Sequence, residues 1–314
     1  MNFRHLRTFV VVAEAGGVAR ASARLNLSQP AASRQIQALE SELGVSLFDR
    51  IGRRIQLTSE GEDLLRHSRR LLSDADSLAA RAGALKKGET GILRVGAAPQ
   101  VIENTLAAFL TRYQRRHPGI GVRLVEDGGT RQAIRLDRGD VHLSIMAAHH
   151  ERFQSRPLYP VYCLAVLSNE HRLSRSRTLE VSELANEPLL LLGAGFGTRT
   201  WFDAACSVAH IRPRVLLESG APHTIMALAR EGYGIAVISS SIVVPRERVR
   251  AVPLVQRGAV IGDWMRITWD SGRFLARYAE QFVDELAVHC RSNYPGRELI
   301  RRAPPLPRPK EPSG

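Results

Sequence analysis

The spacing of apolar and polar residues at the start of the chain predicts three short helices. The first is marked by apolar residues that recur every three or four positions, which are Leu6, Phe9, Val10 and Ala13. A second helix is expected over residues 18–25, and Asn26-Leu27 then turns into a third helix capped by Ser28. Two helices joined by such a short turn define a helix-turn-helix.

The third helix, residues 28–43, has two faces of different chemistry. At about 100° per residue its apolar positions fall within one arc, and they are Ala32, Ile36, Leu39 and Leu43. A separate polar face is formed by Gln29, Pro30, Ser33, Arg34 and Gln37. Gln and Arg form paired hydrogen bonds with base edges in the major groove, and Ser reaches bases or phosphates. We therefore predict that this face reads DNA; the alternative is a polar face that is merely solvated.

A small two-stranded wing is expected after the third helix. Its tip is bent by Gly52 and carries three arginines, Arg50, Arg53 and Arg54. Arginines on such a tip suit the phosphate backbone or a narrow minor groove. Helix, turn and arginine-bearing wing occur in order over residues 1–58, which favours a winged helix-turn-helix DNA-binding domain over the solvated alternative.

Residues 59–88 predict a long helix with a dimerisation seam. Leucines recur at an unbroken spacing of seven, at Leu64, Leu71, Leu78 and Leu85, which is the pattern of a coiled coil. A homodimer would present two recognition helices to two half-sites about one helical turn apart. The alternative is that this stripe packs on the chain's own C-terminal domain.

From residue 89 the pattern changes to short apolar strands that alternate with helices, as in a mainly parallel α/β sheet. The alternation occurs twice, which predicts a domain of two lobes, one over about 89–162 with 269–294 and one over about 163–268. Because the chain passes between the lobes twice, we expect a hinge. Residues 295–314 are rich in proline and charge, and we expect them to be disordered.

Candidate ligand contacts follow from the sheet pattern. Ligands of open α/β sheets sit beyond the carboxyl ends of strands, where helices begin. The loops at those places should converge on one cleft, and they supply Pro99, Gln100, Val101, Gly129, Thr130, His149, Phe196, Thr198, Arg199, His223 and Trp269. Two roles stay open for Arg199, which either pairs with an anionic effector or is solvated. His223 either bonds the ligand or caps a helix.

Other chemistries are disfavoured by spacing. Thr198 stands where a dinucleotide-binding motif starting at Gly193 needs its third glycine. His149 and His150 are adjacent and lack the i, i+4 spacing of a zinc site. The sequence shows no recognisable catalytic spacing, so we predict no enzyme, no catalytic residue, no metal and no cofactor. An architectural DNA-binding protein without ligand control is the competing function.

Composition adds little to this picture. The net charge of +13 favours a polyanionic partner, but residues 1–90 account for only +4 of it. Three widely spaced cysteines argue against a disulfide framework, fit a reducing cytoplasm, and leave a thiol redox switch as a minor alternative. No stretch approaches the length of a membrane span, so we expect no membrane association.

Residues 1–87 resemble the DNA-binding half of LysR-type transcriptional regulators. The shared motif includes Leu27-Ser28-Gln29-Pro30-Ala31, Leu39-Glu40, Leu43-Gly44, Leu47-Phe48 and Leu57-Thr58 with Glu60-Gly61. This resemblance implies a winged helix-turn-helix, a long dimerising linker helix and an effector domain like a two-lobed type 2 periplasmic binding protein. It also implies dimers or tetramers that bind promoter or operator DNA, respond to a small organic effector and act on RNA polymerase. The loop after the family's first effector-domain strand often supplies a Ser or Thr hydroxyl, whereas this chain has Pro99-Gln100, which puts a simple carboxylate effector in doubt.

Overall fold

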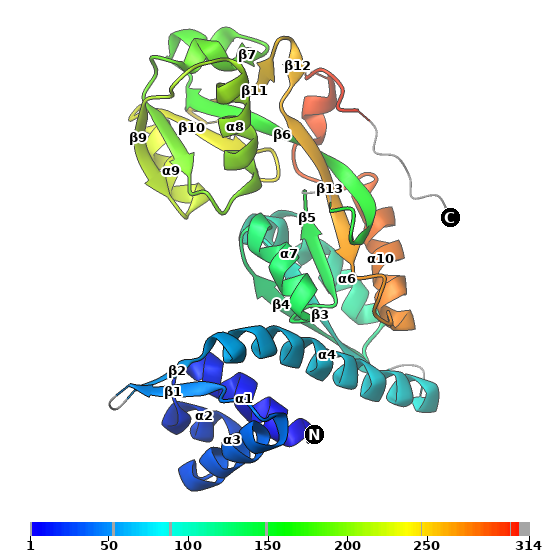
Figure 1. The fold of residues 1–314 in the computed structure, drawn as a ribbon. Helices are drawn as coiled ribbons and strands as arrows, with labels where there is room; N and C mark the ends of the chain where they lie inside the picture. The colour runs from blue at the N-terminus through cyan, green and yellow to red at the C-terminus, as the bar shows by residue number, and fades with distance from the viewer. Residues whose placement is uncertain are drawn as a thin grey trace. The chain divides into compact units, whose positions relative to one another are not determined.

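The computed structural model describes residues 2–51, 54–87, 90–147, 150–245, 247–301 and 303–307. The chain forms two compact units, one of Met1–Lys86 with Asp137–Asp140, and one of Lys87–Leu136 with Val141–Gly314. Figure 1 shows the first unit from blue to cyan and the sheet of the second unit from cyan to orange. Each unit has its own apolar core.

The first unit is a three-helix cluster followed by a hairpin and a long helix. Its elements are α1 (Phe3–Ala15), α2 (Val18–Leu25), α3 (Gln29–Leu43), β1 (Phe48–Ile51), β2 (Arg54–Leu57) and α4 (Ser59–Lys87). The Asn2 side chain caps α1 by accepting from the N–H of Arg4 at 2.8 Å, and the Ser28 hydroxyl caps α3 by accepting from Ala31 at 3.3 Å. Gly16 and Gly44 end α1 and α3 in left-handed conformations. The predicted helix-turn-helix is therefore present.

Helix α4 divides its leucines between two faces. Leu65 and Leu72 are buried in the core of the first unit, beside α1 residues such as Phe9. Leu71 is 36% exposed and Leu78 is 69% exposed in the single chain. Of the predicted seam, Leu64 thus also packs against the core of its own unit, whereas Leu71 and Leu78 are exposed, and the Leu85 side chain lies outside the described part of the structure.

The second unit contains one mixed sheet of eleven strands. The main strand order is β4-β3-β5-β13-β6-β10-β8-β9, with β11 on β6 and with β7 and β12 on β11. The strands are β3 (Gly91–Ala97), β4 (Ile120–Glu126), β5 (Leu143–Met146), β6 (Gln154–Ser168), β7 (Leu179–Glu180), β8 (Leu189–Leu192), β9 (Val215–Ser219), β10 (Ile235–Ser239), β11 (Val249–Gln256), β12 (Ala259–Val260) and β13 (Gly262–Trp269). The helical elements are α5 (Pro99–Val101), the π-helical turn η1 (Ile102–Leu106), α6 (Ala107–Arg116), α7 (Gly129–Arg138), η2 (Arg172–Arg175), η3 (Val181–Leu184), α8 (Gly197–Val208), α9 (Pro222–Arg230), α10 (Arg277–Cys290) and η4 (Arg297–Arg301).

Two long strands connect the two halves of this sheet. β6 and β13 pair antiparallel from Gly262–Tyr162 to Trp269–Gln154, with an irregularity after Met265. β13 continues the sheet to β5, and β6 continues it to β10 and β11, so we name the two halves lobe I and lobe II. The strands within each lobe are largely parallel, as expected. The crossing strands are antiparallel because β6 carries the chain from lobe I to lobe II and β13 returns it to lobe I.

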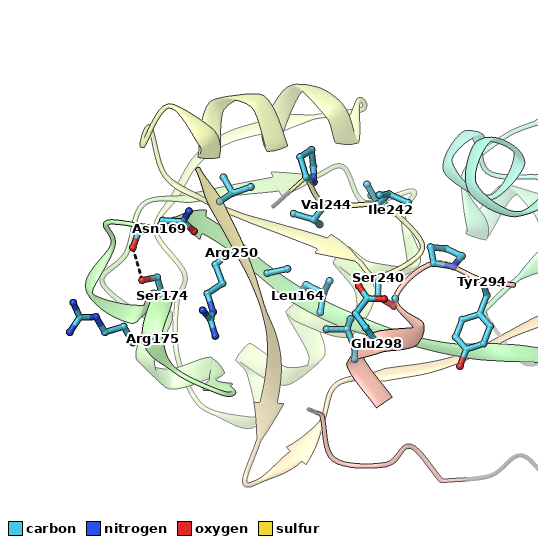
Figure 2. A pocket seen from close by; sticks show the side chains of 17 residues that line it. Leu164, Asn169, Ser174, Arg175, Ser240, Ile242, Val244, Arg250, Tyr294 and Glu298 are labelled. Carbon is cyan, nitrogen blue, oxygen red and sulfur yellow. Dashed lines mark hydrogen bonds between the residues drawn. The ribbon is translucent and has the colours of Figure 1, made fainter. Parts of the chain in front are cut away.

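The expectation of a disordered tail after residue 294 is wrong for residues 295–301 and 303–307. η4 forms there, and Leu299 and Ala303 are buried in the core of lobe II, where Leu306 also packs. Figure 2 shows Tyr294 and Glu298 beside Ser240, on a cavity of about 590 Å³ in lobe II. Apolar residues spaced within the proline-rich stretch give it something to bury, which overrides its composition. Residues 308–314 lie outside the described part of the chain.

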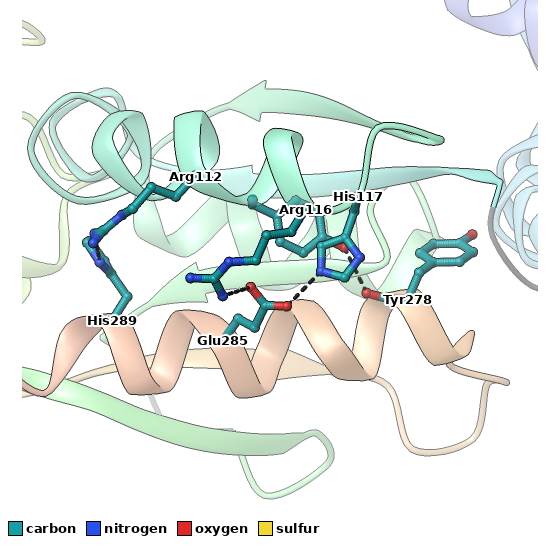
Figure 3. A network of polar contacts seen from close by, with 7 residues as sticks. Arg112, Arg116, His117, Tyr278, Glu285 and His289 are labelled. Carbon is teal, nitrogen blue, oxygen red and sulfur yellow. Dashed lines mark hydrogen bonds and ion pairs between the residues drawn. The ribbon is translucent and has the colours of Figure 1, made fainter.

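Helices α6 and α10 pack together on lobe I through an aromatic and polar contact. Phe109 and Phe282 meet edge to face, with ring centroids 5.0 Å apart. Glu285 accepts from Arg116 at 3.0 Å and contacts His117 Nε2 at 2.7 Å, as Figure 3 shows. The same network includes a contact between Arg112 and His289. Burial, followed by the charge of Arg112, lowers the pKa of His289.

Candidate DNA interface and effector pocket

The two predicted faces of α3 are separate in the structure. Ala32, Ile36 and Leu39 are buried, while Leu43 at the end of the helix is only half-buried. On the other face lie the candidate DNA contacts, of which Gln29, Pro30, Arg34 and Gln37 are exposed and Ser33 is half-buried. These side chains share one face of α3 that is largely exposed.

Two contacts that the sequence reading missed hold α3 in place. The Thr8 hydroxyl of α1 donates to the Gln35 side-chain oxygen at 2.6 Å. The Glu40 carboxylate accepts from the backbone N–H of Leu47 at 2.8 Å and of Phe48 at 3.3 Å. Glu40 thus connects the end of α3 to the start of the wing. Its place in the motif Leu39-Glu40 was a signal that could have been used.

The wing is anchored at its base. β1 and β2 pair antiparallel from Phe48–Leu57 to Ile51–Arg54, and the Phe48 ring meets Phe9 of α1 edge to face at 5.5 Å. Arg50 and Arg54 lie on these two strands, but their side chains are outside the described part of the structure. Arg53 is outside the described residues altogether, so phosphate contact by the three arginines stays a prediction.

A small cavity of about 150 Å³ lies where the hinge strands meet the loops of both lobes. Lobe I contributes the start of α5 and the end of β5, and lobe II contributes the start of α8 and the turn after β10. The lining residues are Ala98, Gln100, Val101, Gly129, Ile145, Met146, Ala147, Val161, Phe196, Gly197, Thr198, Thr200, Trp201, Ser239, Ser241 and Met265. We call this cavity the effector pocket.

The effector pocket gathers part of the predicted set. Of the candidates, those that line it are Gln100, Val101, Gly129, Phe196 and Thr198. Pro99 is exposed beside it, and Trp269 packs half-buried against the core of lobe I. The side chain of Thr130 and all of His149 lie outside the described residues. The sequence reading missed the strand residues of the lining because they occur in apolar runs that read as core.

Arg199 does not extend into the pocket as a free cation. Its guanidinium bonds Glu218 at 2.6 Å and Asp203 at 2.8 Å, and donates to the Leu192 carbonyl at 3.1 Å. Burial alone would lower the pKa of Arg199, but the bonds to the two carboxylates outweigh it and raise the pKa. Both expected roles for Arg199 are therefore unsupported, because its charge is already balanced within lobe II.

His223 joins the lobes rather than lining the pocket. Its Nε2 lies 3.0 Å from Glu103 Oε2, and both side chains are more than half exposed. His223 belongs to α9 of lobe II and Glu103 to η1 of lobe I. This contact is a surface pair, so its net stabilising effect is small.

The lining of the effector pocket is mostly apolar with a few polar groups. Gln100 is 9% exposed, and its side-chain oxygen has no hydrogen-bond partner. Ser239 and Ser241 bond to each other through their hydroxyls. Among the described lining residues none carries a charged side chain. A buried carboxamide oxygen without a partner can accept a hydrogen bond from a ligand that fills the cavity, because leaving that oxygen unpaired is costly.

The cysteines lie away from this pocket, buried in the two lobes. Burial raises the pKa of Cys206 to about 11 and of Cys290 to about 12, and raises that of Cys163 as well. All three are therefore protonated at neutral pH. Protonated, buried thiols are poor nucleophiles, which argues against the redox switch.

The domains of the chain match two family models. Residues 3–62 match the bacterial regulatory helix-turn-helix protein, lysR family, and residues 86–291 match the LysR substrate binding domain. The chain is 33% identical over 275 residues to the uncharacterized HTH-type transcriptional regulator YnfL of Escherichia coli, covering 84% of this chain and 91% of the relative. It is also 33% identical over 254 residues to the HTH-type transcriptional regulator ClcR of Pseudomonas putida, covering 77% and 84%. The chain belongs to the LysR family of transcriptional regulators.

Solved structures share the fold. A full-length OxyR variant from Pseudomonas aeruginosa superposes with a TM-score of 0.70 at 23% identity, covering 93% of this chain and 95% of that one. Full-length CbnR complexed with its target DNA superposes with a TM-score of 0.64 at 24% identity, covering 92% and 100%. The protein is thus a DNA-binding transcriptional regulator with an effector-binding domain. No helix within the described residues is both long and apolar enough to cross a bilayer.

Proposed function

We propose that the exposed face of α3 reads operator DNA in the major groove, while Arg50, Arg53 and Arg54 hold the wing on the DNA backbone or in the minor groove. The observation that carries this proposal is the exposed set of Gln29, Arg34 and Gln37 on a helix whose other face is buried. Glu40 supports it, because it fixes the wing to the same helix. Base contacts give sequence preference, and the arginine contacts give affinity for any sequence.

The chain acts as a dimer or a higher oligomer in this proposal. Leu71 and Leu78 lie exposed on α4, and leucines spaced by seven pack against the same positions of a second helix. Two copies would then bind a pseudo-palindromic site. Tetramer formation and contact with RNA polymerase rest on the family alone. Bacterial promoters are reached in the cytoplasm, which is where the protein would act.

The effector of this proposal is a small, mainly apolar molecule that hydrogen bonds Gln100. A cavity near 150 Å³ accommodates about the volume of a benzene ring. The charge of Arg199 is neutralised by Asp203 and Glu218, so the pocket offers no described cationic side chain to a carboxylate. Closure of the lobes on the effector would change the packing of subunits, and a coupling of about 1–3 kcal/mol would alter operator occupancy several-fold to a hundred-fold.

Selection from a genomic fragment library tests the DNA reading. We expect the full-length protein to enrich a few promoter fragments over random competitor, and Gln29→Ala to change which fragments are enriched. Equal retention of all fragments would contradict sequence-specific binding.

The proposed effector is tested with a panel of compounds. Binding is followed by the tryptophan fluorescence of the chain, to which Trp201 in the pocket contributes. We expect uncharged aromatic or short aliphatic amides and alcohols to shift the emission and to change operator affinity. Gln100→Leu should abolish that shift, and Pro99→Ala, in the same loop but outside the lining, should retain it. Unchanged operator affinity with every compound would favour the architectural alternative.

A further inference from the structure

The C-terminal segment beyond α10 crosses between the lobes a third time. Tyr294 stacks on Tyr159 of lobe I, with ring centroids 5.2 Å apart and planes at 11°. Leu299 and Ala303 are then buried in lobe II. The match to the substrate binding domain ends at residue 291, so this crossing lies outside the matched residues. We call the described residues of this segment, 294–301 and 303–307, the strap.

The end of the strap lies in an aromatic groove on the hinge strands. The indole N–H of Trp264 donates to the carbonyl of Pro307 at 2.9 Å. Pro305 and Leu306 line a cavity of about 380 Å³ together with Tyr159, Tyr162 and Trp264. Proline-rich segments lose little entropy on binding, and aromatic grooves with a hydrogen-bond donor are the usual sites that bind them. The groove therefore holds the chain's own proline-rich segment as its ligand.

The start of the strap is fitted against the turn after β10. Gly296 has a φ of +76°, and a Cβ added to it would lie 2.9 Å from the Cβ of Ser240. The Ser240 hydroxyl in turn accepts from the N–H of Tyr162 at 2.9 Å, and the Ser240 N–H donates to the Tyr162 carbonyl at 2.9 Å. A glycine is required here both for its conformation and for its lack of a side chain. The strap thus touches the point where the turn after β10 is bonded to the hinge strand β6.

Residues that contact the strap are next in sequence to residues that line the effector pocket. Ser239 and Ser241 line the pocket, and Ser240 between them meets the strap. On the hinge strands, Val161 and Met265 line the pocket, and their neighbours Tyr162 and Trp264 line the groove. Neighbouring residues of a strand point to opposite faces. A shift of the hinge strands on the pocket side must therefore move the groove as well.

We propose that the strap is a built-in restraint on the hinge, in which the proline-rich segment, bound in the groove of Trp264 and Tyr162, limits how far the lobes move around the effector pocket. The restraint itself follows from contacts within the chain, and only its link to the effector rests on the function proposed above. Release of the strap frees the hinge, and closure on an effector changes how firmly the groove holds the strap.

Hydrogen–deuterium exchange of the full chain tests this proposal without any effector. Two variants loosen the strap. The first is a chain shortened to end at residue 302. The second is W264F, which keeps an aromatic ring but loses the N–H donor. We expect the backbone amides of residues 159, 161–164 and 239–242 to exchange at least fivefold faster in both variants. W269F is the matched control, because Trp269 lies on the same strand outside the groove, and it should leave these rates unchanged.

The outcomes separate the strap from the proposed function. The restraint would be overturned if W264F and the shortened chain, both folded by circular dichroism, showed unchanged exchange at residues 159, 161–164 and 239–242. Fast exchange of Leu299 and Ala303 in the wild-type chain would overturn it too, since the strap would then be unbound. Faster hinge exchange in both variants, together with a wild-type chain that prefers no DNA fragment, would instead overturn the proposed function and leave the restraint standing.

Discussion

Glu40 and Leu47 connect the recognition helix to the wing, through a carboxylate that accepts a backbone N–H at 2.8 Å. The same carboxylate also accepts from Phe48 at 3.3 Å. One side chain therefore satisfies two backbone donors where the chain leaves α3 and enters β1. The relative position of the base-reading face and the wing depends on this contact.

We expect Glu40→Ala to lower the free energy of unfolding by about 1–3 kcal/mol, because it leaves part-buried backbone donors without a partner. Affinity for specific and random DNA should fall together, since the wing loses its position. Denaturant unfolding and gel-shift titration measure both effects. Glu40→Gln keeps an acceptor and should recover most of the stability; a Glu40→Ala protein as stable as wild type would contradict the assigned role.

Substitutions on the exposed face of α3 should alter sequence preference. We expect Gln29→Ala or Arg34→Ala to reduce the binding free energy by about 1–3 kcal/mol at operators with particular base pairs. Arg50→Ala should weaken binding to all DNA sequences alike. Binding to a set of operators with single base changes measures this difference. Arg66→Ala is a suitable control, because Arg66 is exposed on α4 and paired with Asp63. Equal losses on every sequence for Gln29→Ala and Arg34→Ala would contradict base readout.

The exposed leucines of α4 should matter for assembly more than for the fold of one chain. Leu78 is 69% exposed, so Leu78→Ala removes no contact within the chain that would unfold it. In a dimer, each buried leucine contributes about 1.5–3 kcal/mol, and the dissociation constant should rise accordingly. Sedimentation equilibrium measures this shift, with Arg70→Ala as an exposed control on the same helix. No change in the dissociation constant after Leu78→Ala would favour a different interface.

His142 should make the stability of the effector-binding domain dependent on pH. Burial, followed by the charges of Arg94 and Arg273, lowers its pKa to about 4 from about 6.5. Its Nδ1 accepts from the backbone N–H of Arg94 at 3.1 Å, which requires that nitrogen to be unprotonated. Below pH 6.5 the unfolded chain binds a proton that the folded chain does not. Stability is therefore full above about pH 6.5 and falls toward pH 4.

Between pH 7.5 and pH 5, this one histidine should lower the free energy of unfolding by about 2 kcal/mol. Denaturant unfolding of wild type and of His142→Asn at the two pH values measures it by difference, since other groups titrate in both proteins. The variant should lose less stability on acidification than wild type. His67→Asn, at an exposed histidine on α4, should behave as wild type. Identical pH slopes for wild type and His142→Asn would show that His142 does not contribute.

The DNA-binding half was predictable because its signals are local. Ser28 caps α3, and Ala32, Ile36 and Leu39 mark its buried face within four turns of one helix. The link from Glu40 to Leu47 was not predictable from periodicity, because it depends on how the chain folds back after Gly44. The strands β7, β11 and β12 were also missed, because they are short or pair with distant strands.

The effector pocket was only partly predictable because it is built from distant segments. Gln100, Phe196 and Thr198 follow strands and fit the rule for open sheets, whereas Ser239 and Met265 lie at or within strands that read as core. Asp203, a partner of Arg199, lies four residues further along the same helix, but Glu218 could not be foreseen, since it lies on β9, 19 positions further along the chain. The packing of Leu299 was hidden by the proline content around it.

The effector pocket has one wall of helix starts, with Gln100, Phe196 and Thr198, and one wall of strand residues tied to the strap through Ser240 and Trp264. In the proposed mechanism, substitutions on the first wall change which effector fits without contacting the hinge. Substitutions on the second wall disturb ligand choice and movement at once. Evolution, or a designer seeking a biosensor for a new compound, can therefore retune recognition at the helical wall while the response mechanism is inherited intact.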